Sequence, residues 1–200
     1  MAYVYAIVPS PVGALKVVAS DRGLAAILWE NDDPGRVRLD VVAEDPSHPV
    51  LREVSRQLGG YFAGERQAFA VSLDMVGTEF QKKVWAALLT IPFGQTRSYG
   101  DIARQIGHPK AARAVGAANG RNPISIITPC HRAIGANGTL TGFAGGLAIK
   151  QELLALESGQ GRFAAWQDTG GLHTYRAHLS GSGRAIGTGA DRERATGDER

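Results

Sequence analysis

A short apolar run that ends at the only cysteine of the chain sets the strongest constraint on the fold. Residues 124–127 are rich in β-branched side chains, a composition that favours a buried strand. Pro129 follows this run, and because proline has a fixed φ and no amide hydrogen, it ends the pairing of the strand. The sequence therefore predicts that Cys130 lies at a strand terminus, a common position for a reactive group.

Two basic residues follow this cysteine directly, in the order Cys130-His131-Arg132. Positive charge beside a thiol lowers its pKa and enlarges the fraction of nucleophilic thiolate. A lone cysteine is nevertheless most often a small buried hydrophobe without chemistry, and composition alone favours that interpretation. The residue types by themselves leave a reactive and an inert Cys130 both open.

Two capping boxes predict helix starts in the second half of the chain. Residues 78–81 (Thr-Glu-Phe-Gln) open one helix, and residues 98–101 (Ser-Tyr-Gly-Asp) open a shorter one that Gly107 closes. Pro109 is expected at the first position of a third helix, which runs to about Ala118. Two short helices joined by a tight glycine-containing turn are typical of a helix-turn-helix.

The outer face of the third helix combines basic residues with alanines, namely Lys110, Arg113, Ala114 and Ala117. The alanines are too small to hold the basic residues away from a flat partner. Without the cysteine, DNA binding and a merely solvated basic face are both consistent with this pattern.

The last predicted helix, at residues 147–157, directs a carboxylate towards the core. At roughly 100° per residue, Glu157 falls in the same arc as the buried leucines. A buried carboxylate needs a partner, and His131 is the candidate. A solvated glutamate in a frayed last turn is the alternative, and Lys150 falls in the same arc, which weakens the inference.

The fold class expected is α/β (α+β), in three parts: residues 1–77, 78–159 and 160–200. In the first part, residues 3–29 predict an antiparallel meander of three strands, and residues 37–42 and 69–73 predict further strands. An amphipathic helix at residues 50–62 is expected to cover the sheet. The last part is polar and rich in glycine and charge, which predicts a disordered tail.

Composition limits the possible partners and compartments. The net charge of +3 permits an anionic partner without requiring one. A single cysteine excludes an internal disulfide, and five scattered histidines form no zinc pattern, so neither a metal nor another cofactor is expected. The N-terminus lacks the features of a signal peptide and no run is long enough to span a membrane, so a reducing cytoplasm is expected.

Three pieces of sequence surround the cysteine: Asn122-Pro123, Pro129-Cys130-His131-Arg132, and Gly-Phe-Ala-Gly-Gly-Leu at residues 142–147. Together with the upstream helix pair, they resemble the active-site block of the O6-alkylguanine-DNA alkyltransferases (methylated-DNA–protein-cysteine methyltransferases). The resemblance covers residues 78–159 and implies that Cys130 removes alkyl groups from O6 of guanine, and from O4 of thymine, in duplex DNA. It also implies an RNase H-like sheet in the first domain and a protein that is consumed by its reaction. We expect a monomer, and the sequence leaves open whether several molecules cluster on DNA.

The resemblance assigns roles to individual catalytic residues. His131 activates Cys130 through a water molecule, and Glu157 orients the imidazole from behind. Tyr99 donates its hydroxyl to the leaving guanine, and Asn122 ties the active-site turn to the helix-turn-helix.

For the substrate, the resemblance implies a second helix in the minor groove, with Arg113 entering the duplex where the damaged nucleotide is extruded. The other DNA-binding residues expected are Lys110, Ala111, Ala112, Ala114, Ala117 and Arg132. The lesion pocket is expected to be lined by Pro123, Phe143, Ala144 and Gly145. Phe143 and Ala144 stand where many relatives have tyrosine and some have serine, which leaves the range of alkyl groups open.

Three other functions compete with this one. A non-catalytic relative that senses alkyl lesions is the nearest alternative, but such relatives replace the cysteine. A cysteine hydrolase using Cys130 and His131 would need an oxyanion hole, for which the sequence has no signature. A transcription factor built on the helix-turn-helix would need no reactive thiol. The presence of Cys130 therefore favours the alkyltransferase.

Overall fold

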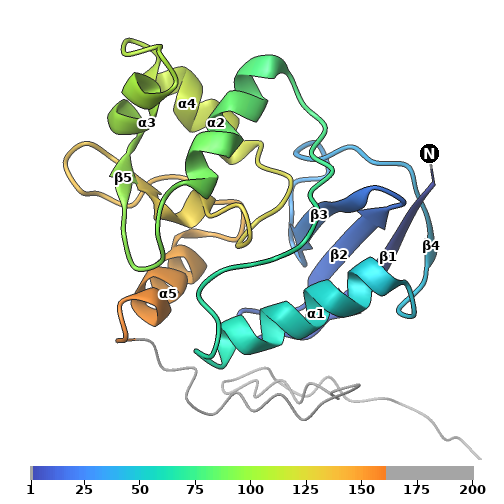
Figure 1. The fold of residues 1–200 in the computed structure, drawn as a ribbon. Helices are drawn as coiled ribbons and strands as arrows, with labels where there is room; N and C mark the ends of the chain where they lie inside the picture. Colours follow the sequence, from blue (N-terminus) through green and yellow to red (C-terminus); the bar gives the residue numbers. More distant parts are fainter. Residues whose placement is uncertain (1, 161–200) are drawn as a thin grey trace, which may run out of the picture.

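The computed structural model describes residues 2–160, which form a sheet-and-helix half followed by a mainly helical half (Figure 1). The first half contains β1 (Tyr3–Val8), β2 (Leu15–Ser20), β3 (Gly23–Trp29), β4 (Val41–Glu44) and α1 (Pro49–Phe62). The second half contains α2 (Glu79–Leu89), β5 (Arg97–Ser98), α3 (Tyr99–Gln105), α4 (Ala112–Gly120), a 3₁₀ turn (Cys130–Arg132), β6 (Ala133–Ile134) and α5 (Leu147–Glu157). Apart from Gln160, the predicted tail lies outside the described residues.

The sheet of the first half has the strand order β3-β2-β1-β4. The predicted meander is present, because β1 pairs antiparallel with β2 and β2 pairs antiparallel with β3. The strand predicted at residues 37–42 is wrong in its bounds, since β4 begins at Val41 and joins β1 in parallel. The apolar alternation of Val37 and Leu39 has another cause: both side chains are half-buried and line a surface pocket.

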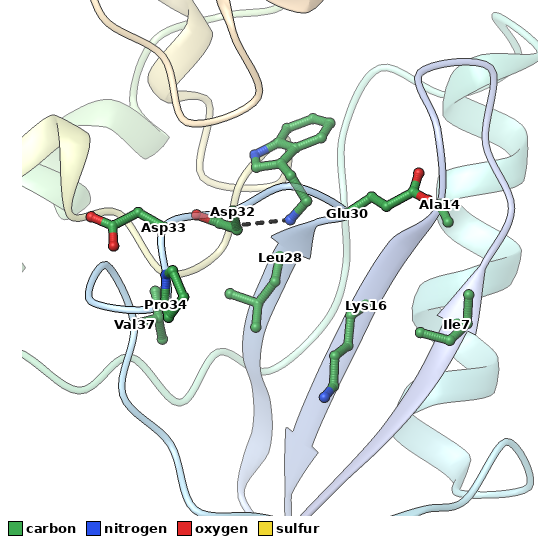
Figure 2. Close-up of a pocket in the computed structure, with 10 residues that line it drawn as sticks. Ile7, Ala14, Lys16, Leu28, Glu30, Asp32, Asp33, Pro34 and Val37 are labelled. Atoms are coloured by element: carbon green, nitrogen blue, oxygen red, sulfur yellow. Dashed lines mark hydrogen bonds between the residues drawn. The ribbon is translucent and has the colours of Figure 1, made fainter.

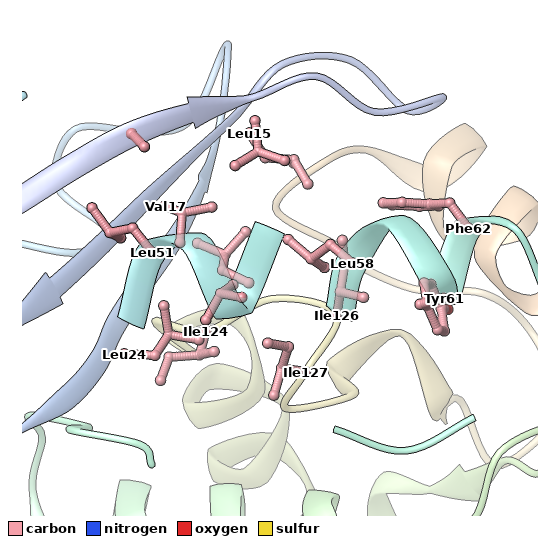
Figure 3. Close-up of a cluster of buried hydrophobic side chains, with 14 of the residues drawn as sticks. Leu15, Val17, Leu24, Leu51, Leu58, Tyr61, Phe62, Ile124, Ile126 and Ile127 are labelled. Atoms are coloured by element: carbon pink, nitrogen blue, oxygen red, sulfur yellow. The ribbon is translucent and has the colours of Figure 1, made fainter. Parts of the chain in front are cut away.

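Helix α1 covers one face of this sheet, as its apolar spacing predicts (Figure 1). It begins with Pro49, whose missing amide hydrogen costs nothing at a helix start. Its buried residues include Leu51, Val54, Leu58, Tyr61 and Phe62. Three isoleucines from the second half, at positions 124, 126 and 127, complete the same cluster (Figure 3). The core of the first half is therefore closed by the segment that leads to Cys130.

That segment is a turn, so the strand predicted at residues 124–127 is wrong. Ile124 makes a single parallel bridge to Ile27, and the chain then turns back through hydrogen bonds from Ile127 N to Ser125 O (2.9 Å) and from Thr128 N to Ile124 O (3.0 Å). Ile126 has φ of 72°, a conformation that is unusual for a β-branched residue. The side chains of this run are buried as predicted, but in the hydrophobic cluster that they share with the sheet and α1, and not by strand pairing.

Residues 69–73 are also irregular, although a strand was predicted there. Leu73 alone forms a bridge, to Leu24 of β3. Backbone bonds from Leu24 N to Ser72 O (2.9 Å) and from Asp74 N to Leu24 O (2.7 Å) hold the segment beside the sheet edge.

The two predicted capping boxes are both present, Thr78 with Gln81 at α2 and Ser98 with Asp101 at α3. The prediction that Pro109 opens the next helix is wrong, because Ala111 N bonds to His108 O (2.8 Å) and Pro109 occupies this turn. Helix α4 starts only at Ala112 and continues to Gly120. The helix pair α3 and α4 thus has the predicted order, with a longer connecting turn.

Candidate active site

Cys130 opens the 3₁₀ turn Cys130–Arg132, so the prediction of a strand terminus is wrong. Its side chain is only 3% exposed. Burial raises the pKa of the Cys130 thiol above its usual value, and a hydrogen bond from Asn122 and the charges of Arg36 and Lys150 oppose this only in part. The expectation that adjacent basic residues lower this pKa is therefore wrong in its net direction. In the free protein the sulfur is held as a protonated thiol.

Glu157, the last residue of α5, lies at the centre of a buried cluster of donors. Its Oε1 accepts hydrogen bonds from Tyr61 Oη (2.8 Å), His131 Nε2 (2.7 Å) and Arg132 Nη2 (2.9 Å). Its Oε2 accepts from Arg132 Nε (2.8 Å) and from the Gly94 amide (3.3 Å). Burial alone would raise the pKa of Glu157, but the bonds from His131 and Arg132 outweigh it and hold the pKa at about 2. The predicted pairing of Glu157 with His131 is present, and the carboxylate is ionised.

His131 is fully buried, and burial lowers its pKa despite the opposing effect of Glu157. An ionised Glu157 accepts from Nε2, so the imidazole is neutral with its proton on Nε2. Nδ1 is buried and has no hydrogen-bond partner within residues 2–160. This arrangement leaves Nδ1 with a free lone pair that can accept a proton.

Arg132 requires a correction, because we expected it to bind DNA. It is 6% exposed, and its guanidinium donates to Glu157 and to the Ile91 carbonyl (2.6 Å). A side chain in this position neutralises a buried carboxylate, and it is not available to a phosphate.

Tyr99, the first residue of α3, lies near Cys130 and belongs to the helix-turn-helix. Its hydroxyl accepts a hydrogen bond from Thr141 Oγ1 (3.2 Å). Burial raises the pKa of Tyr99, and the nearby Cys130 adds to the shift. The phenol therefore keeps its proton at neutral pH and can act as a donor.

Lys150 of α5 is fully buried, like Glu157 on the same helix. Its ammonium donates to the carbonyls of Ala133 (2.6 Å) and Thr141 (2.8 Å). These two carbonyls flank the segment between the catalytic turn and the loop at residues 142–146, so Lys150 holds the two ends of that segment together.

The residues expected at the lesion pocket lie in two places. Pro123 is buried, and its carbonyl accepts from Ile27 N (2.9 Å). Phe143, Ala144 and Gly145 are half-buried in the loop before α5. The Phe143 ring lies 6.4 Å from the His131 ring, between centroids, which brings this loop next to the catalytic cluster.

The expected DNA-binding face lies on α4 and the turn before it. Lys110, Arg113, Ala114 and Ala117 are exposed, and Ala111 and Ala112 are half-buried. On the opposite side, α4 is fixed by Trp85 of α2, whose indole nitrogen donates to the Ala118 carbonyl (2.9 Å).

Asn122 joins these parts at the start of the active-site turn. Its amide donates to the Thr128 carbonyl (2.8 Å), and its Oδ1 accepts from Ile124 N (3.1 Å). The backbone N–H of Asn122 donates to the Asn119 carbonyl near the end of α4 (3.1 Å). The side chain thus replaces the strand pairing that the sequence predicted for this segment.

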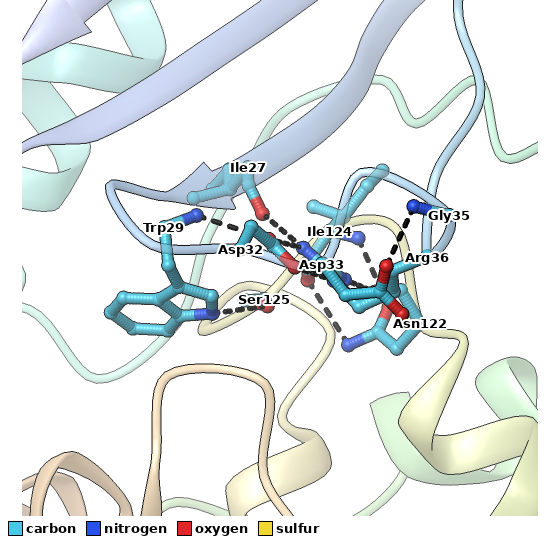
Figure 4. Close-up of polar contacts among 9 residues, drawn as sticks. All are labelled: Ile27, Trp29, Asp32, Asp33, Gly35, Arg36, Asn122, Ile124 and Ser125. Carbon is cyan, nitrogen blue, oxygen red and sulfur yellow. Dashed lines mark hydrogen bonds and ion pairs between the residues drawn. The ribbon is translucent and has the colours of Figure 1, made fainter.

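The sequence did not predict three residues of the first half that support the site. Tyr61 of α1 bonds to Glu157, and Arg36, ion-paired with Asp32, donates to the Asn122 carbonyl (Figure 4). Trp29 donates its indole hydrogen to Ser125 Oγ (3.2 Å). All three contacts join residues at least 86 positions apart, so no local pattern could have signalled them.

Two surface pockets of about 420 Å³ each lie away from Cys130. The first lies on the sheet face that α1 leaves uncovered, where Ile7, Lys16 and Leu28 line it (Figure 2). Within residues 2–160, no group of three His, Cys, Asp or Glu side chains could hold a metal ion, and no helix is long and apolar enough to cross a membrane.

Comparison with known proteins gives matches along most of the chain. A family model described as "6-O-methylguanine DNA methyltransferase, ribonuclease-like domain" matches residues 3–75, and one described as "6-O-methylguanine DNA methyltransferase, DNA binding domain" matches residues 79–159. A methylated-DNA--protein-cysteine methyltransferase of Methanosarcina acetivorans is 53% identical over 154 residues, covering 76% of this chain and 97% of the relative.

Two mycobacterial relatives give the same result. A methylated-DNA--protein-cysteine methyltransferase of Mycolicibacterium paratuberculosis is 52% identical, covering 76% of this chain and 91% of the relative. The crystal structure of Mycobacterium tuberculosis OGT in complex with DNA has a TM-score of 0.72 at 47% identity, covering 80% of this chain and 95% of that chain.

Proposed function

Because this chain belongs to the 6-O-methylguanine DNA methyltransferase family, we propose that it repairs duplex DNA by moving an alkyl group from O6 of guanine to Cys130. The observation that carries the proposal is a neutral His131 that follows Cys130 in the same 3₁₀ turn, with Nε2 fixed by Glu157 and Nδ1 unpartnered within the described residues. O4 of alkylated thymine offers the same chemistry and is included in the proposal.

The reaction is a single displacement in which charge and atoms balance. His131 Nδ1 takes the thiol proton, through a bridging water molecule, and the Cys130 sulfur attacks the alkyl carbon. The new S–C bond forms as the C–O6 bond breaks, and the bonding electrons stay on the guanine. Tyr99 donates a hydrogen bond from its hydroxyl to the ring and so offsets the developing negative charge. The proton taken by His131 returns through water to the guanine anion, which leaves as neutral guanine.

The buried carboxylate makes the proton transfer favourable. When His131 becomes an imidazolium, Glu157 already lies 2.7 Å from its Nε2 and stabilises the new charge without rearrangement. Because burial otherwise keeps Cys130 a thiol, a reactive thiolate forms only together with this ion pair. Since no step removes the alkyl group from sulfur and no cofactor takes part, each molecule acts once.

The DNA is held by α4. The exposed Arg113 and Lys110 flank small alanines, a surface that permits close approach to a minor groove. The target atom is out of reach inside a base stack, so the nucleotide must be extruded, with Arg113 filling the gap. The base then enters beside Phe143, Ala144 and Gly145. The protein is proposed to act as a monomer that is able to cluster on DNA, in a reducing cytoplasm that keeps the thiol free.

Intact-protein mass after reaction with excess duplex DNA containing O6-methylguanine tests the proposal. We expect a gain of one methylene, confined to the peptide that contains Cys130, which stops at one equivalent. The variant Cys130→Ala should bind the same DNA and gain nothing. An unchanged mass of the wild type despite tight binding would overturn the transfer chemistry and favour a protein that only senses the lesion.

A further inference from the structure

Trp29, the last residue of β3, lies where the first domain meets the active-site turn. Its backbone is fixed, because it pairs with Leu15 of β2 and its amide donates to Asp32 Oδ2 (3.1 Å). Its indole hydrogen donates to Ser125 Oγ, five residues before Cys130 (Figure 4). The indole is therefore a rigid group, only 6% exposed, that is anchored on both domains.

The loop before α5 rests on this indole. A Cβ atom added to Gly145 would lie 2.8 Å from Cε2 and 2.9 Å from Cδ2 of Trp29, closer than real side chains approach. Gly145 has no left-handed φ, so its lack of a side chain is required by this contact and not by backbone conformation. The Phe143 ring packs edge-on against Trp29 at 5.4 Å between centroids.

Phe143 connects this contact to the chemistry, because its ring also packs near the His131 ring. The order in space is thus Trp29, then the loop at residues 143–145, then the catalytic cluster. A shift of the loop towards or away from Trp29 changes the space next to the reacting sulfur.

We propose that Trp29 is a positioning residue that sets the width of the lesion pocket and so the preference for small over bulky alkyl groups. This rests on the proposed function, in which the loop at residues 143–145 closes the pocket. Removing the indole lets the loop move away from the catalytic cluster and towards the vacated space. The wider pocket then holds the methyl group of the substrate less tightly and has room for a larger alkyl group. Adding a side chain to Gly145 pushes the loop away from Trp29 and narrows the pocket.

The two substitutions therefore have opposite effects on one ratio. The readout is the rate constant for transfer from O6-benzylguanine divided by that from O6-methylguanine, both in the same duplex under single-turnover conditions. Trp29→Ala should raise the ratio roughly tenfold or more, because a single methylene group in an apolar pocket already changes selectivity by about that factor. Gly145→Ala should lower it. In the Trp29→Ala background the new methyl group occupies space that the indole left and no longer pushes the loop. Gly145→Ala should therefore change the ratio much less in this background than it does in the wild type.

Two controls separate this role from general loosening. Gly142→Ala lies in the same loop region, where a Cβ meets nothing within 4 Å, and should leave the ratio unchanged. Trp29→Phe keeps an aromatic ring beneath the loop but loses the bond to Ser125, and should stay near the wild-type ratio. If Trp29→Ala does not fold, as circular dichroism would show, Trp29→Leu takes its place in the same cycle.

Equal ratios for the wild type and Trp29→Ala, or independent effects that multiply in the double variant, would overturn the proposal. Failure of the proposed function looks different, because the wild type would then accept no alkyl group from either substrate.

Discussion

Replacing Glu157 by glutamine tests the electrostatic account of the buried cluster. Glutamine keeps the size of the side chain but removes the charge that faces Arg132 and His131. The pKa of Glu157 falls from an ordinary value of 4.5 to about 2, and each unit corresponds to about 1.4 kcal/mol. Ionised Glu157 therefore stabilises the fold by roughly 3 kcal/mol over an uncharged group, similar to the ~3–5 kcal/mol for breaking a buried ion pair.

The assay is urea unfolding of the wild type and Glu157→Gln at several pH values. Because the folded-state pKa is depressed, the contribution is complete above pH 4.5 and is lost as pH falls towards 2. The difference in unfolding free energy should thus be roughly 3 kcal/mol at pH 7 and should shrink steadily below pH 4.5. Glu152→Gln, an exposed position on the same helix, is the matched control and should change stability by less than about 0.5 kcal/mol.

A difference below about 1 kcal/mol at pH 7, the scale of an exposed ion pair, would refute the reasoning. So would a difference that stays constant down to pH 2, since it would come from packing and not from charge.

Lys150→Met removes the buried ammonium that donates to the Ala133 and Thr141 carbonyls. Urea unfolding should show a loss of about 1–3 kcal/mol, and an unchanged midpoint would contradict this. Burial lowers the pKa of His131 below its ordinary 6.5, so the imidazole stays neutral down to that pH. The rate of alkyl transfer should therefore be constant between pH 8 and 6.5 and should fall only at lower pH. Stopped-flow rates that already fall above pH 7 would count against His131 as the base. Lys110→Ala should weaken DNA binding at all sequences and reduce the salt slope by about 1, which fluorescence anisotropy against salt concentration would measure. An unchanged slope would contradict a phosphate contact of Lys110.

The sequence was sufficient wherever a structural cause is local. The two capping boxes predicted the starts of α2 and α3, because each needs only a hydroxyl and an acceptor three residues apart. The direction of Glu157 also followed from helical periodicity. Once a buried carboxylate was placed there, its pairing with His131 followed from the cost of leaving it alone.

The errors arose where distant parts of the chain decide the outcome. Residues 124–127 have strand-like composition, but the Asn122 side chain takes up the backbone groups that a strand would have paired. Arg132 was expected among the DNA-binding residues. The neutral His131 does not balance the negative charge of the buried Glu157, however, and Arg132 supplies the positive charge that does. Contacts of Tyr61, Trp29 and Arg36 are set by domain packing, which no short pattern encodes.

The burial of Cys130 has a consequence for the molecule after it has reacted. The sulfur lies in a packed cluster with a 3% exposed side chain, and the reaction leaves a permanent extra alkyl group on it. Adding carbon to a filled core costs about 1–3 kcal/mol, and one or two kcal/mol already raises the unfolded fraction about 5- to 30-fold. A spent molecule is therefore expected to be short-lived where proteases remove unfolded chains. The number of unreacted molecules would then fall by one for each lesion that the cell repairs.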